Sequence, residues 1–216
     1  MRETCAMTDD DAALPSYAAA RRALVGGAAG FWLAVLVCLV ISHSSTTEHD
    51  GISYFGVRGD TLPVIVAGYA SVSVGMLLAA RRLPVDELGR RLALPLRCWP
   101  ACFVALLITP FDKGAALNWT HMTLGVTLAI SQGAVTVWLC SVLFVPRVLV
   151  PAALELVGGL VSALSIPDTS FDYLLQGELL FNAAFCACLV AAVGAAAAVW
   201  GDRGDPAALR RSHAPD

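Results

Sequence analysis

The sequence predicts an all-α fold, a polytopic membrane bundle of six transmembrane helices whose N-terminus and C-terminus both lie in the cytoplasm. Three observations predict it: an apolar composition, six apolar segments of membrane-spanning length, and arginines that alternate across those segments. Hydrophobic residues make up 57% of the 216 residues and charged residues 14%, whereas soluble domains average about 25% charged residues. A surface this apolar needs a lipid covering.

Six apolar segments each come near the ~20 residues that cross a ~30 Å hydrocarbon core. They are residues 23–42, 61–80, 93–109, 118–143, 145–166 and 177–200. Helix is the expected state, because it satisfies the backbone polar groups within one segment. The third segment is short, and Pro95 and Pro100 indicate a kink or a late start. Four tryptophans lie near segment ends, as interfacial tryptophans do: Trp99, Trp119, Trp138 and Trp200.

Polar sequences flank the apolar region on both sides. Residues 1–20 are polar, acidic in part and contain Pro15, which predicts a disordered cytoplasmic tail. Residues 21–200 then form the transmembrane domain, and residues 201–216 a second cytoplasmic tail. The first apolar segment resembles a signal peptide only faintly, since a long acidic stretch precedes it, and the charge pattern indicates that it is retained.

The basic residues predict the orientation of the bundle. With the N-terminus inside, twelve arginines fall in cytoplasmic regions, and only Arg58 and Lys113 fall outside. This alternation follows the positive-inside rule. Because alanine and arginine are frequent and Lys113 is the single lysine, we expect a multi-pass protein of a bacterial inner membrane. A net charge of −3 argues against a nucleic-acid partner.

Cysteines and glycines are explained by packing. The seven cysteines form no CxxC pair, so we expect no metal site, and no cofactor motif is visible. Gly26 and Gly30 match the GxxxG motif of closely packed membrane helices. Contacts inside the bundle explain this match without a dimer, and a homo-oligomer or protein partner stays open.

Glu155 lies near the middle of the fifth segment, where an ionised carboxylate without a partner costs several kcal/mol. One interpretation is a proton or cation carrier, or a ligand-binding carboxylate. The other is a protonated glutamate bonded to a neighbouring helix.

A second polar group is predicted at the outer side of the membrane. His121 begins the fourth segment and could be a general base or a histidine at headgroup level. Glu178 and Asn182 form one stripe of the sixth segment with Cys186 a turn deeper. The helix dipole also favours an acidic residue in a first turn, which is the structural explanation for Glu178. With Asp112 from the preceding loop, His121 and Glu178 are the candidate catalytic residues.

Two stretches carry a family resemblance. The first stretch, shortly after the first segment, is Ile52-Ser53-Tyr54-Phe55-Gly56. The second is Thr109-Pro110-Phe111-Asp112, and His121 follows nine residues after Asp112. The chain resembles the bacterial six-helix membrane proteins grouped as domain of unknown function 998. The resemblance implies the six-helix layout and would single out Ser53, Asp112 and His121 at the outer face. It implies no particular activity.

Three function classes remain. The first is a non-enzymatic membrane protein that acts through lipid or protein partners, and the sequence favours it because nothing in the chain demands more. The second is a small proton-coupled carrier that uses Glu155. The third is a membrane-embedded hydrolase with an outer-face site of Asp112, His121 and Glu178. Ser53, Glu155 and Asn182 are the candidate binding residues.

Overall fold

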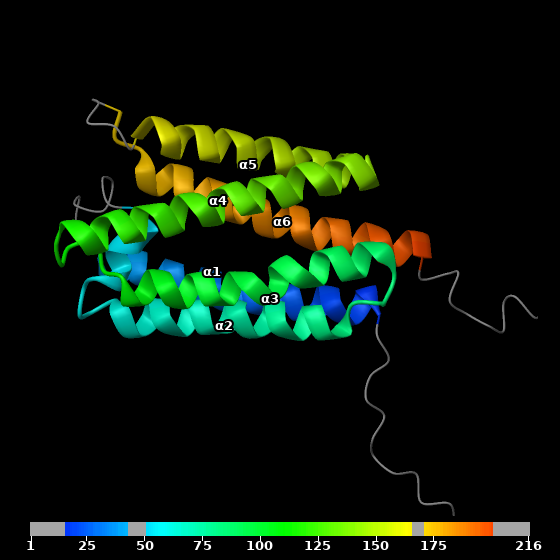
Figure 1. Cartoon of the computed structure of the whole chain (residues 1–216), viewed down its shortest axis with the longest axis horizontal. Helices are drawn as coiled ribbons and strands as arrows, with labels where there is room; N and C mark the ends of the chain where they lie inside the picture. The colour runs from blue at the N-terminus through cyan, green and yellow to red at the C-terminus, as the bar shows by residue number, and fades with distance from the viewer. Residues whose placement is uncertain (1–15, 43–50, 166–170, 201–216) are drawn as a thin grey trace, which may run out of the picture.

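The computed structural model describes residues 16–42, 51–165 and 171–200, and these residues form six long helices and one short 3-10 helix. The elements in chain order are α1 (Tyr17–Ile41), η1 (Ile52–Gly56), α2 (Leu62–Arg82), α3 (Glu87–Ile108), α4 (Ala115–Leu143), α5 (Pro146–Ser165) and α6 (Leu174–Trp200). All six long helices are long and apolar enough to cross a membrane. The predicted all-α bundle of six candidate transmembrane helices is therefore confirmed (Figure 1).

The helices pack as two groups with α4 between them. Helices α1, α2 and α3 form one group, and the hairpin of α5 and α6 forms the other, joined to the first where α1 meets α6. Helix α4 packs less extensively against α3, α5 and α6, and Figure 1 shows it running between the two groups. This looser packing of α4 leaves room for the cavity described below.

Helix α1 begins earlier than the sequence predicted. Ser16 caps its N-terminus, accepting a hydrogen bond from the Ala19 amide at 3.1 Å, and Tyr17, Ala19 and Ala20 are buried. The prediction of a disordered tail over residues 1–20 is therefore wrong for Tyr17–Ala20. Their order comes from tertiary contacts, because the Tyr17 hydroxyl donates to the Asp86 carboxylate at 2.7 Å. Residues 1–15 and the predicted tail of 201–216 lie outside the described residues.

Helix α3 also begins before its predicted start at residue 93. Asp86 is its N-cap and accepts from the Gly89 amide at 2.7 Å. Pro95 and Pro100 then lie inside the helix and do not delay its start. The hydropathy pattern missed the first turn and a half because these residues are charged, whereas a capped helix end tolerates charge outside the hydrocarbon core.

Asp86 links the N-terminal ends of α1 and α3, and replacing it tests that link. In Asp86→Ala, α3 loses its cap and the Tyr17 hydroxyl loses its acceptor. We expect a loss of about 2 kcal/mol in the free energy of unfolding, measured by titration into denaturing detergent. Glu87→Ala is the matched control, because Glu87 makes only an exposed ion pair with Arg91, and its effect should stay below about 0.5 kcal/mol. Equal effects of the two variants would contradict this interpretation.

Trp99 corrects the prediction of a tryptophan belt. Its side chain is 2% exposed, packs edge-on against Phe185 at 5.1 Å between ring centroids, and donates from Nε1 to Ser131 Oγ at 2.9 Å. Trp99 thus joins α3 to α4 and α6 in the core. Trp119 is 74% exposed, as the belt interpretation requires.

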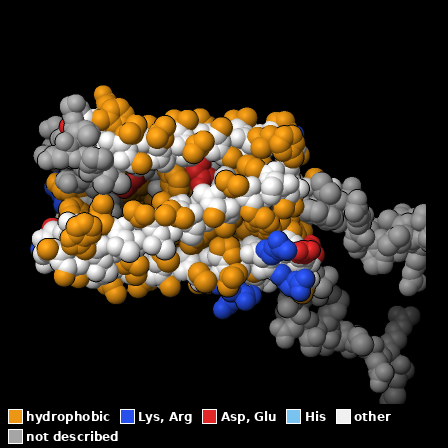
Figure 2. Space-filling view, turned by 45° about the horizontal axis from the view of Figure 1, so that its top comes forward, with side chains coloured by type: hydrophobic (Ala, Val, Ile, Leu, Met, Phe, Trp, Pro, Cys, Tyr) orange, Lys and Arg blue, Asp and Glu red, His pale blue; other side chains and the backbone are white. Residues whose placement is uncertain are grey.

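The basic residues gather at one end of the bundle. The described arginines predicted to be cytoplasmic lie near the ends of α1, α2, α3 and α5 that share this side, and Figure 2 shows the cluster beside a largely hydrophobic flank. Arg58 and Lys113 lie at the other end, next to η1 and α4. This separation is the pattern that orients membrane proteins, but the direction of insertion stays a prediction.

Candidate functional site

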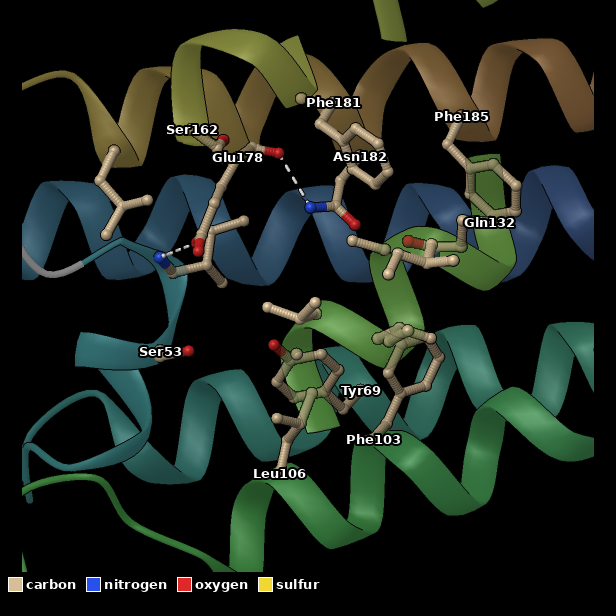
Figure 3. A pocket seen from close by; sticks show the side chains of 18 of the residues that line it. Ser53, Tyr69, Phe103, Leu106, Gln132, Ser162, Glu178, Phe181, Asn182 and Phe185 are labelled. Carbon is tan, nitrogen blue, oxygen red and sulfur yellow. Dashed lines mark hydrogen bonds between the residues drawn. The ribbon is translucent and has the colours of Figure 1, made fainter. Parts of the chain in front are cut away.

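A cavity of about 320 Å³ lies between α4 and the two helix groups. Residues from all six long helices and from η1 line it (Figure 3). Its volume is at the lower end of the ~300–1,000 Å³ typical of small-molecule sites. Three lining residues of α4, Met122, Val126 and Ile130, are also exposed on the flank of the bundle. The cavity therefore opens sideways, where lipid surrounds a membrane protein, and acidic atoms are visible between the hydrophobic atoms of this flank in Figure 2.

Most of the cavity wall is apolar. Tyr69 stacks on Phe103 with 5.3 Å between ring centroids and lies 5.5 Å from Phe31, which forms an aromatic wall from α1, α2 and α3. Phe181 and Phe185 face it from α6 (Figure 3). Such rings offer a large contact area to an alkyl chain.

The short helix η1 closes one end of the cavity, and Glu178 holds it there. The backbone amide of Ile52 donates to Glu178 Oε2 at 2.6 Å. Gly51, just before η1, has a φ of 66°, a conformation that side chains disfavour. A Cβ at Gly51 would also lie 2.6 Å from the Glu178 carboxylate. Gly51 therefore permits both the turn and the close approach of the carboxylate.

Ser53 and His121 form a hydrogen-bonded pair at this end. The Ser53 Oγ lies 2.8 Å from His121 Nε2, and His121 Nδ1 lies 2.7 Å from the Thr109 carbonyl oxygen. A carbonyl oxygen only accepts, so Nδ1 carries a proton, and in the neutral ring Nε2 accepts from the serine hydroxyl. Thr109 is the C-cap of α3, where helix carbonyls carry partial negative charge.

Several polar groups face the cavity without a partner. Among the described residues, the Tyr69 hydroxyl and the Gln132 amide make no hydrogen bond, although Gln132 is 3% exposed. Ser162 Oγ also has no partner, but it has almost no exposed surface and packs close to Gly177 of α6, so it does not open onto the cavity. Asn182 Nδ2 donates to the Glu178 carbonyl at 2.8 Å, and Figure 3 shows its other amide atom turned toward the cavity. Buried polar groups are normally satisfied, so this set indicates a ligand with its own donors and acceptors.

Lysine and arginine are missing from the described residues that line the cavity. Arg58, near η1, makes two hydrogen bonds to Asp60, at 3.0 and 2.8 Å. The hydrogen bond to Asp60 raises the pKa of Arg58, and the same bond lowers the pKa of Asp60. Both groups therefore stay charged and satisfy each other outside the cavity.

Asp112 does not join the other candidate residues. It forms an ion pair with Lys113 at 3.1 Å, its side chain is 35% exposed, and it does not line the cavity. The cavity is lined by four of the other candidates: Ser53, His121, Glu178 and Asn182. They form two separate hydrogen-bonded sets, Ser53 with His121 and Glu178 with Asn182. The sets meet at η1, where Glu178 binds the amide of Ile52 and His121 binds the next residue, Ser53. The trio of Asp112, His121 and Glu178 is thus not brought together. Within the described residues, no group of three His, Cys, Asp or Glu side chains could hold a metal ion.

Glu155 is 2% exposed and lies one helical turn from the cavity-lining Gly159. Thr136 donates to its Oε2 at 2.7 Å, while its Oε1 has no partner among the described residues. This bond to a neighbouring helix is the one that the structural interpretation of Glu155 expects. A role in carrying protons stays a prediction.

Thr136 is expected to stabilise the bundle through this bond. Thr136→Val leaves both carboxyl oxygens of Glu155 without a donor, which should cost about 1–3 kcal/mol of unfolding free energy. The double variant with Glu155→Leu should recover most of that loss, because no polar group is then left buried. Thr123→Val is the control, since Thr123 is exposed and bonds only its own helix turn. A double variant less stable than Thr136→Val would contradict the account.

Sequence reasoning missed Tyr69, Ser162 and the Thr109 carbonyl. Tyr69 and Ser162 sit in apolar segments and carry no motif, so only their unpartnered state marks them. The Thr109 carbonyl is a backbone group, and no residue type signals it. The comparisons add no candidate residue: no family model, no curated protein and no solved structure matches the chain. The resemblance to the six-helix family, carried by residues such as Ser53 and His121, stays a prediction.

Proposed function

We propose that this integral membrane protein binds an uncharged single-chain amphiphile in its lateral cavity, with the polar head at the η1 end. We also place it in a bacterial inner membrane with the η1 end outward, on the strength of the arginine distribution. The observation that carries the proposal is an apolar cavity, open on the lipid-facing flank, whose described lining includes the unpartnered polar groups of Tyr69 and Gln132.

The polarity of the lining supports an uncharged head. A phosphate or carboxylate head needs arginine, lysine or a set of amide donors, and no lysine or arginine stands among the lining residues that the structure describes. Toward the η1 end the lining offers a carboxyl at Glu178, an amide at Asn182, and hydroxyls at Ser53 and Tyr69, whereas the amide of Gln132 lies at the far end of the cavity. These groups suit a ligand with hydroxyl, ester or amide functions, such as a monoacylglycerol.

The shape of the cavity supports a single chain. The lining residues of α4 extend from His121 to Gln132, about 16 Å along the helix axis at 1.5 Å per residue. A volume of about 320 Å³ over that length suits one alkyl chain and a small head. The exposed lining residues of α4, Met122, Val126 and Ile130, border the lateral opening through which such a ligand enters from the bilayer without crossing water.

Two glycines of α4 provide a matched test. A Cβ at Gly125 or at Gly133 meets no atom within 4 Å, so neither backbone position excludes a side chain. Gly125 lines the cavity and Gly133 does not. In phosphatidylcholine nanodiscs, tritiated 1-decylglycerol should bind the protein saturably. Gly125→Leu should weaken binding at least about tenfold, a loss of about 1.4 kcal/mol, and Gly133→Leu should leave it unchanged.

The choice of competitor tests the head group. An excess of unlabelled 1-decylglycerol should displace the tracer, whereas decyl phosphate, with the same chain and a dianionic head, should displace it poorly. Binding that is not saturable, or that Gly125→Leu leaves unchanged, would overturn the proposal. Stronger displacement by the phosphate would overturn the assignment of an uncharged head.

A further inference from the structure

We infer that the cavity is also a reaction site, in which Ser53 is a nucleophile and His121 its general base for cleaving a carboxylic ester of the bound amphiphile. The inference rests on the proposed function, because the ester must lie in the cavity. It stands on a geometry that binding alone does not require: a serine hydroxyl 2.8 Å from a histidine nitrogen whose other nitrogen is fixed at 2.7 Å by a carbonyl.

Ser53, His121 and the Thr109 carbonyl together supply the three groups that activate a serine nucleophile. The nucleophile must lie within hydrogen-bond reach of a base, and a third group must orient the base. Here Ser53, His121 and the Thr109 carbonyl take those roles, and the partial negative charge at the C-terminus of α3 favours the imidazolium that forms during attack. The ring of Phe111, 5.8 Å from the His121 ring, packs beside the base.

The position of the pair also fits the reaction. Ser53 and His121 line the main cavity and, together with Tyr69, a side cavity of about 10 Å³. That volume is about what one water molecule needs. The side cavity can therefore supply the hydrolytic water at the serine, and the unpartnered Tyr69 hydroxyl borders the same space as a donor for a developing oxyanion.

The reaction balances with water as the sole co-reactant. Ser53 Oγ forms a bond to the ester carbonyl carbon while its proton passes to His121 Nε2. The carbon–oxygen bond to the alcohol then breaks, and the leaving oxygen takes that proton. Water attacks the resulting acyl-serine, gives a proton to Nε2, and the acyl–Oγ bond breaks as Oγ is reprotonated. The products are a carboxylic acid and an alcohol.

The test separates reaction from binding by using two glycerol lipids. Hydrolysis is measured with 1-decanoylglycerol, an ester, and binding with the ether 1-decylglycerol, which has no acyl carbon. A fluorophosphonate probe, whose fluoride is displaced by an activated serine, reports the nucleophile, and mass spectrometry locates the adduct. We expect the wild-type protein in nanodiscs to hydrolyse the ester and to carry the adduct on Ser53.

Substitutions of Ser53 and His121 test their roles as nucleophile and general base. Ser53→Ala should lose both adduct and hydrolysis entirely, whereas binding of the ether, which loses one hydroxyl of the site, should weaken by no more than about tenfold, a difference of about 1.4 kcal/mol. His121→Gln should slow hydrolysis about 10²–10⁴-fold, the usual contribution of a general base, and should flatten its dependence on pH. Ser141→Ala is the matched control, because Ser141 is exposed and bonds only its own helix turn, and it should behave as wild type.

The outcomes distinguish a failure of the reaction at Ser53 from a failure of ligand binding. Ether binding without any Ser53 adduct or ester hydrolysis would overturn this inference and leave the proposed function standing. An adduct on another serine that persists in Ser53→Ala would overturn it as well. Absence of ether binding in the folded wild-type protein would overturn the proposed function and this inference together.

Discussion

Replacing Gly27 by leucine is expected to separate α1 from α2 and to destabilise the bundle by at least about 3 kcal/mol, the upper end of typical overpacking costs. A Cβ at Gly27 would lie 2.9 Å from the Gly75 Cα, and a Cβ at Gly75 would lie 2.7 Å from the Gly27 Cα. Both neighbours are backbone atoms, which no rotamer change can move aside. The free energy of unfolding in detergent measures the effect.

Gly26 provides the control on the same helix. A Cβ at Gly26 meets nothing within 4 Å, and the residue is exposed on the flank of the bundle. Gly26→Leu should therefore change stability by less than about 0.5 kcal/mol. If Gly26→Leu proved as damaging as Gly27→Leu, the close approach of α1 and α2 would not be the feature that requires glycine.

Replacing Glu178 by leucine should have the second large effect, on the site more than on the bundle. Glu178 accepts from the Ile52 amide and so fixes η1, which presents Ser53 to His121. Without it the Ile52 amide is left unsatisfied, and a buried donor without a partner costs about 1–3 kcal/mol. We expect binding of 1-decylglycerol to weaken between about tenfold and a hundredfold.

A variant at Gly51 should reproduce this loss without removing the carboxylate. The side chain of Gly51→Val meets Glu178 and requires a φ that valine disfavours. Gly59→Val, in the same inter-helix segment, meets nothing within 4 Å and is the control. Normal ligand binding by Gly51→Val would show that the position of η1 does not govern the site.

The six-helix layout was predictable because it follows from composition. Apolar segments of about twenty residues have one stable state in a bilayer, and the structure confirms each of them. The residues at which the helices begin were not predictable in the same way. Tyr17–Ala20 are ordered by a bond to Asp86, a partner 69 residues away, and hydropathy carries no signal for such a contact.

The site was predictable only in part. Periodicity places Glu178, Asn182 and Cys186 on one stripe, and all three line the cavity. Helix spacing does not tell which face of one helix packs against which face of another. The pairing of Ser53 with His121 and the separation of Asp112 from them are therefore visible only in the folded structure. The glycine motif shows the same limit: Gly30 does pack closely, against Ser71, but Gly26 meets nothing, and the backbone-to-backbone approach is made by its neighbour Gly27.

Photo-crosslinking shows whether the lateral cavity takes up a single-chain uncharged amphiphile. A 1-alkylglycerol with a diazirine in its chain is added in trace amount to nanodiscs containing the protein, and adducts are mapped by mass spectrometry. We expect adducts concentrated on the cavity walls, at residues 122–132 of α4 and 181–186 of α6, and their loss in Gly125→Leu. Adducts spread over the outward-facing residues of α3, such as Leu94 and Val104, with no enrichment at the cavity, would contradict it.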